Sequence, residues 1–202
     1  MEYNGPQPNS LIEGASIRFH WQQLAPVAIL SASLAAQTSG INPVLLAKAS
    51  AGDAQSQVLI GDFYAAGTVV AHDLKLAAEW YKRAADQDNL AGELHLADLY
   101  RDGGKGFPRE LTQAVAWYRK AAEQGDATAQ GILGLLYSIG QGVPHDDLEA
   151  YYWLDLAAAV PGPNQQKYAA NRQLIGTHIT TDELEEVEER VAKWKAAHPR
   201  PQ

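Results

Sequence analysis

The chain has 202 residues, of which 46% are hydrophobic and 20% charged, and its formal net charge at pH 7 is −8. An acidic balance with scattered Lys and Arg argues against nucleic-acid binding, because contact with phosphates needs a basic surface. The sequence contains no cysteine, which excludes disulfides, thiolate metal sites and cysteine nucleophiles.

Residues 1–40 form the first segment, which we interpret as a leader or an extra N-terminal helix. Its apolar stretch Leu24–Ala36, LAPVAILSASLAA, has the length of a signal-peptide core but is too short to span a membrane. The stretch starts late, and the acidic residues before it outweigh Arg18, which argues against a signal. Both interpretations stay open, so the protein is periplasmic or secreted if Leu24–Ala36 is a signal core, and otherwise cytoplasmic.

Residues 41–52 predict a short capping helix, equivalent to half of the unit that is repeated after it. Asn42 is suited to cap its start, Pro43 to its first helical position, and Gly52 to its end.

Three similar units follow, over residues 53–88, 89–125 and 126–161. Two aromatic positions recur at intervals of 36 and 37 residues: Tyr64, Tyr100 and Tyr137, and Trp80, Trp117 and Trp153. Each unit contains two helical patterns separated by a glycine, and each first helix begins after a capping residue, namely Asp53, Asn89 or Asp126. The sequence therefore predicts three antiparallel helix pairs.

Small residues recur within these helices. The first helix of each unit has Gly61, Ala97 or Gly134 at one position, and the second has Ala84, Ala121 or Ala157 at another. Glycine inside a helix costs about 1 kcal/mol relative to alanine. We therefore expect two helices to approach closely there, with an aromatic side chain of one lying over the small residue of the other.

Residues 162–202 predict a helical C-terminal cap. One helix is expected over Gln165–Ile175, and a last helix is expected to begin with a capping box at Thr180. The apolar stripe of this last helix comprises Leu184, Val187, Val191 and Trp194.

Taken together, residues 43–160 resemble the Sel-1-like repeats, relatives of the tetratricopeptide repeats. The third unit, GDATAQGILGLLYSIGQGVPHDDLEAYYWLDLAAA, carries the resemblance most fully. The first unit departs from it with Thr68 and Val69 in place of a glycine pair, and the second with Glu93 in place of glutamine. The resemblance implies an all-α solenoid of stacked antiparallel helix pairs. It also implies a protein interaction adaptor or scaffold that is not an enzyme and has no cofactor.

Several histidine and carboxylate residues are candidates for a catalytic or metal site: His72, Asp73, His95, His145, Asp146 and Asp147. The His-Asp sequences precede predicted second helices, where Asp acts as a cap, and His95 has no nucleophile near it in sequence. We therefore expect no catalytic, cofactor or metal site.

By analogy with tetratricopeptide grooves, exposed positions of the first helices are expected to line a concave binding groove. These positions are Gln55, Val58, Asp62, Leu94, Asp98, Arg101, Asp102, Leu135 and Ser138. The groove is mildly acidic, so a basic or amphipathic segment of a protein or peptide partner is expected to bind there. Two alternatives remain: a secreted hydrolase of the cysteine-rich Sel-1-like type, disfavoured because the chain has no cysteine, and a module that assembles only with itself.

Overall fold

The computed structural model describes residues 40–199, which fold into nine helices and contain no strand beyond one isolated bridge between Gly104 and Phe107. Residues 1–39, which include the predicted leader, lie outside the described part. In chain order the helices are α2 (Pro43–Ser50), α3 (Ala54–Ala66), α4 (Leu74–Ala85), α5 (Leu90–Asp102), α6 (Leu111–Glu123), α7 (Ala127–Ile139), α8 (Asp147–Ala158), α9 (Gln165–Gly176) and α10 (Thr181–Ala197). The all-α repeat fold expected from the sequence is confirmed.

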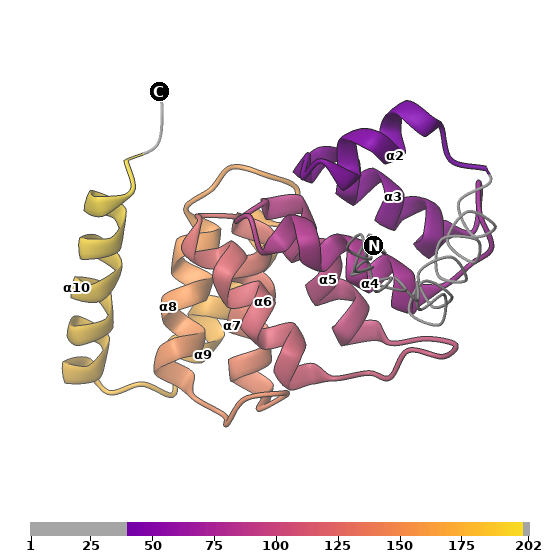
Figure 1. The fold of residues 1–202 in the computed structure, drawn as a ribbon. Coiled ribbons are helices and arrows are strands. Elements are labelled where there is room, and N and C mark those ends of the chain that lie inside the picture. The colour runs from indigo at the N-terminus through magenta and orange to yellow at the C-terminus, as the bar shows by residue number, and fades with distance from the viewer. Residues whose placement is uncertain (1–39, 200–202) are drawn as a thin grey trace, which may run out of the picture. The chain divides into compact units, whose positions relative to one another are not determined.

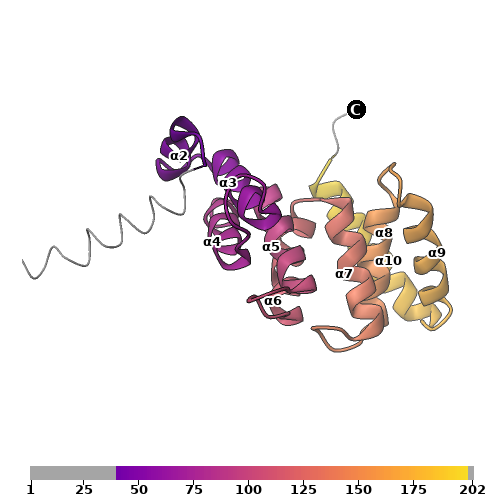
Figure 2. The ribbon, with the colours of Figure 1, turned by 90° about the vertical axis from the view of Figure 1, so that its right-hand side faces the viewer.

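Within this part of the chain, each helix packs against the next as far as α9 (Figures 1 and 2). Helices α3 and α4, α5 and α6, and α7 and α8 form the three antiparallel pairs, and α10 packs against α8. Among the described residues, none of these helices is both long and apolar enough to cross a membrane.

Capping residues set the starts of the first helices. The side chain of Asp53 accepts a hydrogen bond from the Ser56 amide at 2.7 Å, and that of Asp126 accepts one from the Ala129 amide at 2.7 Å. Helices α3 and α7 end at Gly67 and Gly140, whose φ angles of 66° and 65° suit glycine. These bonds and turns confirm the helix boundaries expected from the sequence.

Close contact within the first and third helix pairs occurs at a glycine. The ring of Tyr81 in α4 lies where a side chain at Gly61 of α3 would be. In the third pair, a Cβ atom on Gly134 would lie 2.7 Å from Cγ of Leu154 and 3.0 Å from the Ala150 carbonyl oxygen. The expected close approach is confirmed, but the large residue facing Gly134 is a leucine and not an aromatic residue.

The core of the described part consists of two groups of buried side chains that meet at α5. Leu96 belongs to the N-terminal group and Ala97 to the C-terminal group. Trp80 and Trp153 are buried as expected. Trp117 is only partly buried, and the Lys120 ammonium lies 4.3 Å from its ring centre. The prediction that Trp117 is a core residue like Trp80 and Trp153 is therefore only partly correct.

A buried glutamine links neighbouring helix pairs. Gln57 and Gln130 each donate from Nε2 to the carbonyl of a residue eight positions earlier, Ala49 and Ala122, at 3.0 Å. The equivalent residue of the second unit is Glu93, which is 1% exposed and accepts a hydrogen bond from Gln124 at 2.8 Å. Burial raises the pKa of the Glu93 carboxyl, which the Lys120 charge only partly offsets.

The C-terminal cap is fixed to α8 by apolar and ionic contacts. Val187 and Val191 of α10 are buried, and the capping box at Thr180 is present, as the sequence predicted. Asp155 of α8 accepts hydrogen bonds from Arg172 of α9 and from Lys195 of α10. Burial by itself would raise the pKa of Asp155, but the two cations outweigh burial and hold that pKa below its ordinary value.

Replacing Gly134 with alanine tests the close approach of α7 and α8. Alanine favours a helix by about 1 kcal/mol over glycine, yet the added methyl group would press against Leu154 and the backbone of α8. We expect a net loss of about 1–3 kcal/mol in the free energy of unfolding, measured by urea denaturation. Gly162→Ala is the control, because nothing lies within 4 Å of its Cβ position. A Gly134→Ala protein as stable as the control would contradict the packing.

Replacing Glu93 with glutamine tests the links between helix pairs. A glutamine at this position could donate to the Ala85 carbonyl, as Gln57 and Gln130 do at the equivalent carbonyls, so Glu93→Gln is expected to stabilise the fold by about 1 kcal/mol at pH 7. Folding raises the pKa of the Glu93 carboxyl above its ordinary 4.5. The unmutated protein therefore loses stability as pH rises from the ordinary pKa through the higher pKa of the folded state. The gain should therefore shrink at pH 4. Urea denaturation at both pH values checks this, and a variant less stable at pH 7 would contradict it.

Candidate docking site

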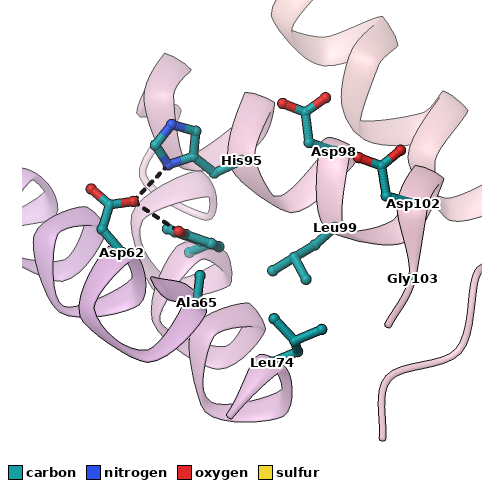
Figure 3. A pocket seen from close by; sticks show the side chains of 9 residues that line it. Asp62, Ala65, Leu74, His95, Asp98, Leu99, Asp102 and Gly103 are labelled. Carbon is teal, nitrogen blue, oxygen red and sulfur yellow. Dashed lines mark hydrogen bonds and ion pairs between the residues drawn. The ribbon is translucent and has the colours of Figure 1, made fainter. Parts of the chain in front are cut away.

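A cleft of about 350 Å³ opens between α3 and α5 (Figure 3). It is lined by Asp62, Ala65, Leu74, Tyr81, His95, Asp98, Leu99, Asp102 and Gly103. Asp62 and Ala65 come from α3, Leu74 and Tyr81 from α4, and the remaining residues from α5 and its C-terminal glycine. The site therefore depends on the packing of the first unit against the second.

A tyrosine of the second helix holds an aspartate of the first helix in two of the units. The Tyr81 hydroxyl donates to Oδ1 of Asp62 at 2.8 Å, and the Tyr118 hydroxyl donates to Oδ1 of Asp98. Burial raises the pKa of both phenols, and their bonds to these carboxylates raise it further. In the third unit the equivalent positions are Leu135 and Leu154, so this polar pair is confined to the first two units.

Arg101 joins the two carboxylates at the far end of the cleft. Its Nε and one terminal nitrogen donate to the two oxygens of Asp102 at 2.8 and 2.9 Å. Its other terminal nitrogen lies 2.8 Å from Oδ1 of Asp98 and donates to the Tyr118 hydroxyl at 2.6 Å. The hydrogen bonds from Arg101 lower the pKa of Asp102. Asp98 and Asp102 therefore share one cation.

Asp62 has a different neighbour. Nδ1 of His95 lies 3.1 Å from Oδ1 of Asp62, but out of line for a hydrogen bond, and this nitrogen is shielded from solvent. The His95 ring meets the Tyr81 ring edge-on, with 5.0 Å between ring centres. The His95 side chain is 41% exposed and the Asp62 side chain 40% exposed, so solvent or a ligand can reach both.

The cleft combines negative charge with an apolar surface. Three carboxylates line it and Arg101 compensates one of them, which leaves an excess of two negative charges when His95 is neutral. Ala65, Leu74 and Leu99 line the same cleft and lie below the Asp62–His95 pair and the other two carboxylates in the view of Figure 3. This arrangement suits the binding of a group that has both an apolar part and a positive charge.

The structure brings three of the nine residues proposed for the groove into this cleft: Asp62, Asp98 and Asp102. Arg101 lies beside them. The other five lie outside the cleft. Gln55 is exposed, whereas Val58 is only 8% exposed and belongs to the core. Leu94 and Leu135 are partly buried against the core, and the Ser138 hydroxyl donates a hydrogen bond to the Leu135 carbonyl of its own helix.

Sequence reasoning missed the residues from α4 and placed His95 outside any site. Tyr81 directly follows the recurring Trp80 and has Tyr118 as its equivalent, and both tyrosines occur in the units that carry an aspartate in the first helix. This co-occurrence of a tyrosine and an aspartate in the same units could have predicted that the two side chains lie together. His95 directly precedes the core residue Leu96, and only the packing of α5 against α3 brings it to Asp62.

Among the other candidate residues, two aspartates serve as helix caps and one histidine lies beside a carboxylate. Asp73 and Asp146 cap α4 and α8 through their side chains, whereas Glu110, at the same position before α6, makes no such bond. His145 lies 3.2 Å from Asp147. Within residues 40–199, no group of three or more such side chains is arranged to hold a metal ion.

Stacked antiparallel helix pairs with a cleft between the first helices of neighbouring units define an α-helical repeat solenoid. The Sel1 repeat model matches three stretches, residues 54–89, 91–126 and 127–159, and these cover about half of the chain. The chain therefore belongs to the Sel1 repeat family. Proteins with these repeats are generally non-catalytic scaffolds and commonly mediate protein–protein interaction.

Two solved structures are similar to the chain. A Sel1 repeat protein from Oxalobacter formigenes is 31% identical, with a TM-score of 0.57, and the match covers 75% of this chain and 59% of that one. A protective antigen of uropathogenic Escherichia coli strains, described as displaying an SLR fold, is 22% identical with a TM-score of 0.38, and the match covers 75% of this chain and 47% of that one. The chain thus spans less than two thirds of either protein. Among curated proteins, none matches it.

A double-mutant cycle on Tyr118 and Asp98 tests whether the cleft carboxylates also stabilise the fold. Tyr118→Phe removes a buried hydroxyl that bonds Asp98 and Arg101, and we expect it to cost about 1 kcal/mol of unfolding free energy. Asp98→Ala is expected to cost a similar amount. The double variant should cost less than the sum of the two, since each substitution removes the same bond. Strict additivity in urea denaturation would contradict the coupling.

Proposed function

We propose that this chain is a non-catalytic adaptor that binds a protein or peptide partner along the exposed positions of α3, α5 and α7. The observation that carries the proposal is the cleft between α3 and α5, where carboxylates surround an apolar surface. Side chains that are held in place by neighbouring residues, as Asp62 is by Tyr81 and Asp98 by Tyr118, lose little freedom on binding. The cleft is thus preorganised for a ligand.

The charge of the cleft favours a basic or amphipathic segment as the partner. Opposite charges across an interface speed association and select among partners. Further along the same face, Leu94 and Leu135 are partly exposed and Gln55 is exposed. A segment anchored at the cleft could extend over these residues, which is how an adaptor would gain contact area without a deep pocket.

The test uses a random peptide display library, selected on the full chain at pH 7.5, with affinities of the selected peptides measured by fluorescence anisotropy. Asp62→Asn combined with Asp98→Asn removes two charges from the cleft but keeps an oxygen that accepts each tyrosine hydrogen bond. We expect this double variant to bind the selected peptides about tenfold more weakly, since it loses ionic contacts at the centre of the interface.

The matched control is Glu79→Gln combined with Glu123→Gln. These two exposed residues lie on the second helices α4 and α6, so the control makes the same change in net charge away from the cleft. Its affinity should equal that of the unmutated chain. Failure to select any peptide, or equal weakening by the two double variants, would contradict the proposed docking site.

A further inference from the structure

Asp62 is the carboxylate of the cleft that a ligand cation can reach with least competition. Asp98 and Asp102 are both bonded to Arg101. Within residues 40–199, Asp62 has no ion pair with Lys or Arg; its carboxylate accepts a hydrogen bond from the Tyr81 hydroxyl and lies 3.1 Å from Nδ1 of His95. Negative charge in the cleft is therefore least compensated at Asp62.

The surface beside Asp62 fits the stem of a long basic side chain. Ala65, Leu74 and Leu99 form an apolar surface in the same cleft, below Asp62 in the view of Figure 3. Lys and Arg place their methylene groups along such surfaces while the charged end stays at a polar edge. A guanidinium or ammonium group at Asp62 would thus leave its stem in contact with these three residues.

His95 is positioned to compete with such a cation. The charged and titratable groups around it are Asp62 from α3, Tyr81 from α4, and Asp98 on its own helix, which bonds Tyr118 of α6 and Arg101. Imidazole gains a proton between about pH 8 and pH 5. A protonated His95 would pair with Asp62 at their present separation of 3.1 Å and add a positive charge beside the ligand's own.

We propose that the cleft binds a Lys or Arg side chain of the partner at Asp62, and that protonation of His95 expels this side chain as pH falls. The proposal rests on the proposed docking function and specifies which chemical group of the partner is recognised. It makes the adaptor release its partner in mildly acidic surroundings.

The experiment uses peptides selected at pH 7.5 that contain no histidine, each also made with citrulline in place of Arg or glutamine in place of Lys. Citrulline keeps the shape of arginine but is neutral. We expect neutral peptides to bind about tenfold more weakly to the unmutated chain, with the loss abolished in Asp62→Asn.

Affinities are then compared at pH 7.5 and pH 5.5, which is above the ordinary range in which carboxyl groups titrate. The unmutated chain should bind the basic peptides about tenfold more weakly at pH 5.5. His95→Gln should change its affinity less than about twofold between the two pH values. His178→Gln, which alters an exposed histidine outside the cleft, is the control and should keep the full pH dependence.

The outcomes separate this inference from the proposed function. Selected peptides that need Asp62 and Asp98 but contain no Lys or Arg would overturn the inference and leave the docking site standing. A pH dependence that survives in His95→Gln would overturn the role of His95. Peptides indifferent to Asp62→Asn with Asp98→Asn would overturn both proposals.

Discussion

The structure depends on the close approach of two helices within a repeat, where in the first and third repeats a glycine faces a large side chain. In the first unit Gly61 leaves room for the Tyr81 ring. Because the ring lies flush against α3, its hydroxyl reaches the next residue, Asp62, and fixes the carboxylate at the edge of the cleft. The packing that builds the solenoid thus also positions the candidate site, and the cost of glycine in a helix is offset by this contact.

The cleft carboxylates consequently have two roles. Asp62 and Asp98 accept hydrogen bonds from tyrosines whose rings are buried between helices, and they also supply the negative charge that faces outward. The third unit shows the alternative, since Leu135 and Leu154 occupy the same positions and make that region apolar. At this one position of the first helices, the side chain is charged in the first two units and apolar in the third.

Periodicity made the fold predictable from the sequence. Capping residues, terminal glycines and small residues recur at fixed intervals, and each acts on its own helix or on the adjacent one, so local rules suffice. The cleft was only partly predictable, because Tyr81 and His95 reach Asp62 from two different helices, and periodicity does not show how far a side chain reaches. Val58 was placed in the groove for the same reason, since its position repeats but its burial depends on the neighbouring helix.

The most direct test of this account is a crystal structure of the full chain with the tightest-binding arginine-containing peptide at pH 7.5. The account predicts a guanidinium group within about 4 Å of the Asp62 carboxylate, the usual limit for an ion pair, with its stem on Leu74 and Leu99. A peptide bound on the outer faces of α4 and α6, or at the cleft with its arginine turned into solvent, would contradict it.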